Sequence, residues 1–177
     1  MRPSDPGALI SRSPVTLTVA GVKVTVPFAP AAAWLDALQD PARAVLHLAD
    51  KPSKERLMWA LLDVPGAEDA IRTQSYDLIR RATGRSQWWE STRLANTAAS
   101  PDVLGRLVLA GVDPHTRSIG EWCAAMYTVA TQNADQTQQI KFDMTLAFPP
   151  PGYEDEWDDD EDYESMAAGF RDLPGQG

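Results

Sequence analysis

The sequence predicts a mainly α protein: an N-terminal β-hairpin followed by a compact bundle of about seven short helices, with a disordered acidic C-terminal tail. Three observations lead to this fold class. Apolar residues alternate with polar ones near the N-terminus, recur at helical spacing through the middle of the chain, and give way to acids after a proline cluster. We therefore expect a flexible arm over residues 1–14, a folded domain over 15–148 and a tail over 149–177.

The hairpin is predicted by the stretch VTLTVAGVKVTVPF, residues 15–28. Its valines and Leu17 alternate with threonines and Lys23 on both sides of Ala20-Gly21, and a short glycine-containing turn between two such runs favours a hairpin. Two strands alone are only marginally stable, so the apolar face should pack on helices or pair with another chain. Self-association through the hairpin edge is therefore one predicted contact of the protein.

Helical spacing of apolar residues starts after Pro30 and continues to Phe148. Prolines at predicted first turns, glycines at predicted helix ends and three prolines after the last segment divide the series. Trp34, Trp59 and Trp122 lie on apolar stripes and are expected in the core. The stripe beside Trp59 consists of Leu57, Met58, Leu61 and Leu62, and a later one of Ile119, Trp122, Met126 and Val129. The predicted segments are 31–40, 41–50, 51–64, 66–84, 86–100, 100–114, 116–132 and 134–148.

The net charge of −9 belongs entirely to the tail. From residue 149 onward there are ten acids and one base, whereas the first 148 residues hold 15 of each. A neutral body gives no general attraction to nucleic acid, and an acidic tail would repel phosphate. The basic cluster of Arg80, Arg81 and Arg85 is explained by the favourable placement of cations at a helix C-terminus. No nucleic-acid partner is expected.

The location of the protein follows from what the sequence lacks. No apolar run approaches the roughly 18 residues that a spanning helix needs, so no membrane partner is expected. The N-terminus has no apolar stretch of the kind found in signal peptides. The single cysteine, Cys123, excludes an internal disulfide, and a reducing cytoplasm is the simplest compartment.

Residues that could carry catalysis are few. His47, His115 and Cys123 are the candidates, but no nucleophile signature surrounds them, so no enzyme activity is expected. The acidic run fails the calcium-loop pattern twice, because Tyr163 stands where glycine is required and Gly169 where glutamate is required. There is no glycine-rich phosphate loop either. We therefore expect no metal and no cofactor.

The tail contains six large apolar side chains that solubility alone does not explain. Tyr163, Met166 and Phe170 would share one face of a helix that folds on a partner offering an apolar groove and positive charge; the alternative is a passive solvated tail. Trp88 and Trp89 point about 100° apart on a helix, so either both pack internally or one forms part of a partner groove. The predicted partner-binding residues are Trp88, Trp89, Tyr153, Trp157, Tyr163, Met166 and Phe170.

The order of parts in the C-terminal half resembles the tail assembly chaperones of long-tailed bacteriophages that infect actinobacteria. The resemblance lies in the pair of tryptophans in GRSQWWESTRLANTAAS, in LGRLVLAGVDPHTRSIGEWCAAMYTVAT, and in KFDM running into prolines and the acidic tail. The N-terminal hairpin and first helices match only in a generic way. The resemblance thus covers roughly half of the chain.

The resemblance implies a non-enzymatic role. Such chaperones are small helical proteins of the host cytoplasm that coat the long tape measure protein before tail tube subunits polymerise around it, and they are absent from the mature virion. Many exist in two forms, the longer made by a programmed ribosomal frameshift. This chain would be the shorter form, with the tape measure protein and the longer form of itself as partners.

Two other functions stay open at the level of sequence. One is an acidic decoy or inhibitor of a DNA-binding protein, although confinement of the charge to the tail argues against it. The other is a minor structural component that remains in the virion.

Overall fold

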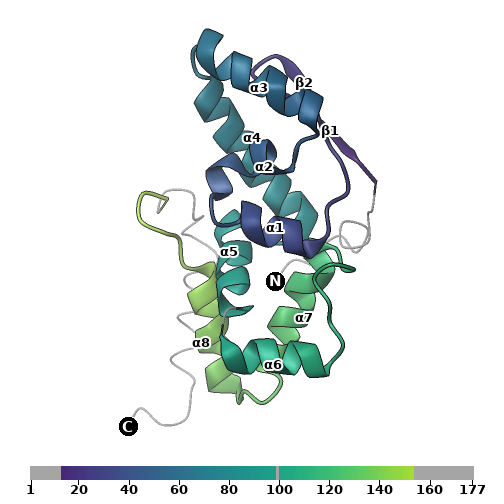
Figure 1. The fold of residues 1–177 in the computed structure, drawn as a ribbon. Coiled ribbons are helices and arrows are strands. Elements are labelled where there is room, and N and C mark those ends of the chain that lie inside the picture. Colours follow the sequence, from purple (N-terminus) through teal and green to yellow (C-terminus); the bar gives the residue numbers. More distant parts are fainter. Residues whose placement is uncertain (1–12, 99, 154–177) are drawn as a thin grey trace.

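The computed structural model describes residues 13–98 and 100–153 of the chain. Within them, an antiparallel hairpin precedes eight α-helices and one 3₁₀ turn, which confirms the predicted hairpin-and-helix fold. The hairpin and α3 lie at one end of an elongated body and α6 lies at the other (Figure 1). The elements are β1 (Val15–Val19), β2 (Val22–Val26), α1 (Ala31–Ala37), η1 (Pro41–Arg43), α2 (Ala44–Leu48), α3 (Lys51–Asp63), α4 (Ala67–Thr83), α5 (Trp88–Ala98), α6 (Pro101–Leu109), α7 (Ile119–Thr131) and α8 (Gln136–Ala147).

The hairpin forms where the alternating pattern predicts it. Strands β1 and β2 pair with Val15 opposite Val26 and Val19 opposite Val22. Ala20 and Gly21 have φ angles of 48° and 77°, and two positive φ values are what a type I′ turn requires. One face of the hairpin enters the core through Leu17, Val19, Val24 and Val26.

The outer edge of β2 is covered by the start of α3. The N–H of Thr25 donates to Ser53 Oγ at 3.0 Å, and the carbonyl of Thr25 accepts the N–H of Asp50 at 3.0 Å. Arg56 donates to the carbonyl of Lys23 at 2.9 Å. Because these groups are occupied, any pairing of the hairpin with another chain has to use β1.

Helix α4 is the centre of the body and packs against β1, α2, α5 and α7. Its polar groups that face inward are satisfied. Ser75 Oγ accepts the N–H of Val45 at 3.1 Å, and Thr83 accepts a hydrogen bond from Ser91 at 2.8 Å while donating to the carbonyl of Ile79. Buried Leu78 and Ile79 supply the apolar part of the same face. The helix therefore joins the hairpin end of the molecule to the α5–α7 end.

Trp59 corrects a prediction. Trp34 and Trp122 are buried as expected, but Trp59 is 67% exposed, and its neighbours Met58 and Leu62 are 56% and 76% exposed. Only the face of α3 with Ser53, Leu57 and Ala60 is buried, where α3 packs on β2 and α4. The apolar stripe is wider than the surface available to cover it, so its outer part faces solvent.

The helix ends follow local sequence signals. Ser118 and Glu121 form a capping box at α7, and Asp135 and Gln138 form one at α8. Helix α4 ends at Gly84, whose φ of 68° is the left-handed conformation that favours glycine at a helix C-terminus. Helices α7 and α8 therefore begin, and α4 ends, close to the predicted positions.

Candidate functional site

Three of the predicted partner-binding residues come together in one aromatic cluster. Tyr76 of α4 stacks on Trp88 with ring centroids 4.4 Å apart and planes 6° apart. Tyr153 meets Trp88 edge-on at 5.3 Å, and its hydroxyl lies 2.7 Å from the hydroxyl of Tyr76. Trp89 contacts Trp88 edge-on at 5.7 Å. Both tryptophans are buried, so the pair packs internally, and Tyr153 packs against both rings.

The other four predicted residues, Trp157, Tyr163, Met166 and Phe170, lie outside the described residues. Tyr153, which the sequence assigned to the tail, packs on the body. The chain reaches it through a turn in which the N–H of Tyr153 donates to the carbonyl of Pro150 at 3.1 Å and Gly152 has a φ of 86°. Proline followed by a positive-φ glycine is typical of a type II turn.

Side chains of α5 donate hydrogen bonds to the backbone carbonyls at the end of α8. A helix leaves its last four carbonyls without intrahelical partners, and prolines after the helix have no N–H to donate. In α8, the carbonyl of Met144 accepts the N–H of Phe148. The carbonyl of Ala147 accepts the indole N–H of Trp89 at 3.0 Å. The carbonyls of Thr145 and Leu146 accept hydrogen bonds from a second residue of α5.

That residue is Arg93, which no sequence motif indicates. Its Nη1 donates to the carbonyls of Thr145 at 2.6 Å and Leu146 at 3.1 Å, and also to the carbonyl of Phe148. Burial lowers the pKa of this guanidinium from its ordinary value. Trp89 and Arg93 are spaced i, i+4 on one face of α5, so together they hold the end of α8 and fix where the tail begins.

Helix α6 carries an exposed apolar face, the α6 face, formed by Leu104, Val108 and Leu109. These side chains are 47%, 67% and 90% exposed, respectively. Gly105 lies among them, and a Cβ added there would meet nothing within 4 Å. The two charged side chains of α6 pair with each other at 2.7 Å, Arg106 with Asp102.

The outer side of α3 forms a second exposed apolar surface, the α3 face, made of Met58, Trp59 and Leu62. It lies at the end of the body opposite α6 (Figure 1). All three residues belong to the stripe that was predicted to lie in the core.

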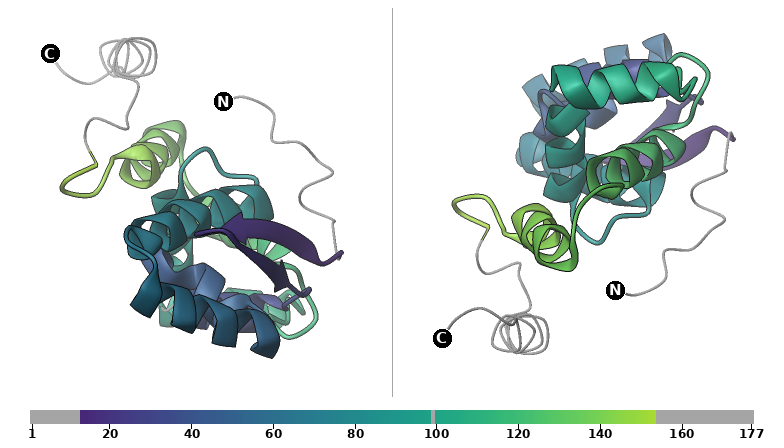
Figure 2. Two further views of the ribbon diagram at one scale, coloured as in Figure 1. Left: turned by 90° about the horizontal axis from the view of Figure 1, so that it is seen from above. Right: turned by 90° about the horizontal axis from the view of Figure 1, so that it is seen from below.

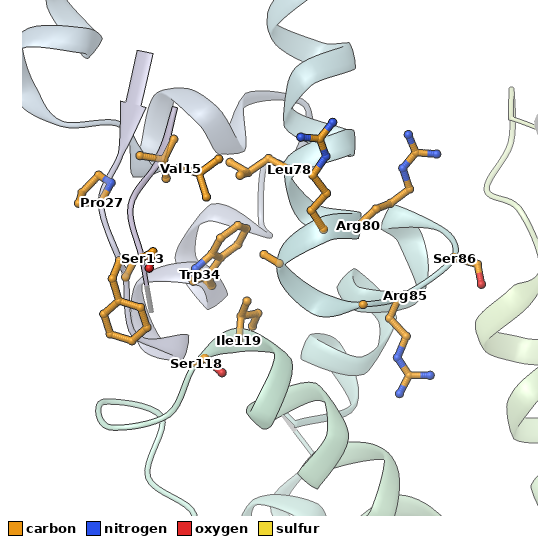
Figure 3. A pocket seen from close by; sticks show the side chains of 16 residues that line it. Ser13, Val15, Pro27, Trp34, Leu78, Arg80, Arg85, Ser86, Ser118 and Ile119 are labelled. Atoms are coloured by element: carbon orange, nitrogen blue, oxygen red, sulfur yellow. The ribbon is translucent and has the colours of Figure 1, made fainter. Parts of the chain in front are cut away.

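A cavity of about 590 Å³ opens between the base of the hairpin, α1, α4 and the start of α7. Its lining is mostly apolar and includes Val15, Val26, Trp34, Leu78 and Ile119. In Figure 3, Arg80 and Arg85 lie on the side of the cavity that faces α8. A cavity of this size is in the range of ligand-binding pockets.

The three arginines of the cavity rim are partly neutralised. Arg80 and Arg81 share one carboxylate, Asp77, at 3.6 and 2.6 Å. Arg85 lies 3.9 Å from Glu90, a carboxyl whose pKa burial raises despite this neighbour, and its guanidinium sits over the ring of Tyr127 at 5.1 Å. Three guanidinium groups thus face two carboxylates, which leaves positive charge at the rim.

The candidate catalytic residues lie on three different elements. His47 on α2 and His115 in the α6–α7 loop are exposed, whereas Cys123 on α7 is buried. Burial raises the pKa of the Cys123 thiol to about 12, so it stays protonated at neutral pH. Among residues 13–98 and 100–153, no group of three or more His, Cys, Asp or Glu side chains could hold a metal ion. No helix in the described part of the chain is long and apolar enough to cross a membrane.

Comparison with protein-family profiles, with curated proteins and with solved structures gives no match to this chain.

Proposed function

We propose that the protein is a non-enzymatic chaperone that binds an apolar helical client and keeps it soluble. In the form suggested by the sequence resemblance, the client is the tape measure protein of a long-tailed phage, bound before tail tube polymerisation. The proposal puts the protein in the host cytoplasm and outside the mature virion, with a longer frameshifted form of itself as a second partner.

The observation that carries the proposal is the α6 face. Pro101, Leu104, Gly105 and Val108 lie at i, i+3, i+4 and i+7, so they share one side of the helix, and none is charged. An apolar helix stripe of this kind is the surface that a second amphipathic helix packs against.

Gly105 adds a reason to expect a close partner. Glycine inside a helix costs about 0.5–1 kcal/mol relative to alanine. Nothing in the described part of the chain comes near enough to Gly105 to require the missing side chain. A helix of another protein that packs closely on α6 would explain the choice of residue.

The α3 face supports the same proposal independently. Trp59 and Met58 are residue types that interfaces favour. Because the two faces lie at opposite ends of the body, one copy could contact a long client at two places (Figure 1). The two faces consist of uncharged side chains, so these contacts would be mainly apolar and, over such small areas, weak and reversible.

The test is co-expression with the longest helical protein encoded downstream, followed by measurement of its soluble fraction and of co-purification. Two variants probe the faces: Val108→Glu with Leu109→Glu, and Trp59→Glu with Leu62→Glu. Each pair should weaken binding at least about tenfold, because a buried large apolar side chain contributes about 1.5–3 kcal/mol. The charge-matched control is Gln132→Glu with Asn133→Glu, two exposed positions that belong to neither face, which should bind like the original chain.

The contribution of the tail is tested by removing residues 154–177. The cut falls after Tyr153 because removing Tyr153 would also disturb the aromatic cluster. A client that stays insoluble and unbound with the full chain would contradict the proposal. Recovery of the protein in purified virions would favour a structural component instead, and tight binding to a basic DNA-binding protein would favour the decoy.

A further inference from the structure

The cavity between the hairpin, α1, α4 and α7 combines an apolar interior with a basic rim. Trp34, Leu78 and Ile119 point toward it from α1, α4 and α7 (Figure 3). Arg80, Arg81 and Arg85 bring the excess positive charge described above. The matching ligand is a peptide segment with a large apolar side chain beside several carboxylates.

The chain itself contains such a segment. Residues 157–163, WDDDEDY, place five consecutive acids between Trp157 and Tyr163. The arm before Ser13 is a poorer match, because residues 1–12 contain two arginines and one aspartate. The charge of the rim therefore selects the tail over the arm.

The tail also starts at the right place. Tyr153 lines a second, more polar cavity together with Arg72, Arg80 and Trp88. Arg80 lines both cavities, so the path from one to the other passes around a single helix, α4. Figure 2 shows that α8, which leads into Tyr153, lies at the side of the body away from the hairpin, so the tail must turn around α4 to reach the cavity.

The length of the tail permits this path. A helix with its side chains is about 10–12 Å across, so half its circumference is about 17 Å. Trp157 can lie up to about 14 Å along an extended chain from Tyr153, and Tyr163 up to about 35 Å. Trp157 is therefore too close to Tyr153 along the chain to pass half-way around α4, whereas Tyr163 has chain length to spare.

We propose that residues 157–163 of the chain's own tail dock in this cavity, with the acids of residues 158–162 at the rim formed by Arg80, Arg81 and Arg85 and Tyr163 on the apolar lining behind them. This binding site is independent of the proposed chaperone function, because it needs no client. The acidic tail would then have a binding site on the folded domain of the same chain.

The experiment uses the full chain with Tyr163→p-benzoylphenylalanine, a photoreactive para-substituted aromatic residue, and identifies crosslinked residues by mass spectrometry. The expected result is crosslinking within one molecule to residues that line the cavity, at a yield independent of protein concentration. The same photoreactive residue at Leu173 is the matched control and should give a much lower yield at the cavity.

The role of the rim is tested by adding Arg80→Glu with Arg81→Glu, both exposed enough to change without loss of packing. The yield at the cavity should fall about fivefold, since ion pairs of the tail with Arg80 and Arg81 would together contribute about 1 kcal/mol. The control is Arg43→Glu with Arg106→Glu, two arginines in exposed ion pairs that do not line the cavity, which should leave the yield unchanged.

Three results would overturn the proposal. Crosslinks between molecules would show that the tail binds a second copy, and crosslinks scattered over the surface would show that it has no fixed site. A cavity yield unaffected by the Arg80 and Arg81 reversals would show that the rim does not select the acids.

Discussion

Replacing Arg93 should test how α8, and with it the start of the tail, is held on the body. Among the described residues of α8 only Leu146 is fully buried, so apolar packing alone holds this helix weakly. Arg93 and Trp89 supply donors that the prolines after the helix cannot. We predict that Arg93→Ala destabilises the protein chiefly by undocking α8.

The magnitude follows from the surroundings of each bond. Two of the three carbonyl bonds of Arg93 are exposed, so water can replace them, whereas the bond to Leu146 is partly buried. One hydrogen bond to a charged group contributes about 1.5–3 kcal/mol, and this is the expected loss in the free energy of unfolding for Arg93→Ala. Arg93→Lys keeps the charge but loses the planar fork, so it should lose about half as much.

The assay is urea denaturation together with hydrogen exchange of the α8 amides. The control is Arg106→Ala, which removes an exposed pair with Asp102 on α6 and should change stability by no more than about 0.5 kcal/mol. The amides of α8 should lose protection in Arg93→Ala and keep it in the control. Equal effects of the two substitutions on stability and exchange would refute the reasoning.

Two further predictions concern burial. On α3, Leu57→Ala should cost about 2–5 kcal/mol, whereas Leu62→Ala should cost no more than about 0.5 kcal/mol, because the first side chain is buried and the second is exposed; denaturation curves that show equal losses would contradict the exposure of this face. At Cys123, burial raises the thiol pKa from 9.0 to about 12. Between these two pKa values the folded thiol keeps a proton that the unfolded thiol loses. The contribution of Cys123 to the free energy of unfolding is therefore fully present below about pH 9. It is lost as the pH rises toward 12, by up to about 1.4 kcal/mol per pH unit. Denaturation between about pH 8 and about pH 10.5 should show this slope in the original chain and a flatter one in Cys123→Ala; parallel slopes would argue against the raised pKa.

Local sequence signals predicted the fold well where they act over a few residues. The alternation around Ala20-Gly21 gives the hairpin and its turn, and the stripe of Ile119, Trp122, Met126 and Val129 gives the buried face of α7. Trp59 shows the limit of the same reasoning. Its stripe is as apolar as that of α7, but burial depends on how many elements surround a helix, and α3 lies at the end of the body.

The candidate site was predicted in part. The sequence predicted two alternatives for the Trp88-Trp89 pair. The structure shows internal packing, because Tyr76 of the preceding helix stacks on Trp88 and Tyr153, far away in sequence, meets it edge-on. Arg93 was not predicted, because its acceptors are backbone carbonyls of α8 that only the fold brings close to α5. The proline run was the signal that could have found it, since a helix that ends in prolines needs donors from elsewhere.

The sequence by itself determined the hairpin, the succession of helices and their ends, and the separation of a neutral body from an acidic tail. Each of these depends on residues near one another in the chain, through alternation, helical spacing, capping and charge. Tertiary structure alone decided which apolar stripes are covered, which leaves the faces of α3 and α6 exposed, and which distant side chains meet. Burial and the cavity beside α4 are properties of several elements packed together, and no single segment of the sequence contains them.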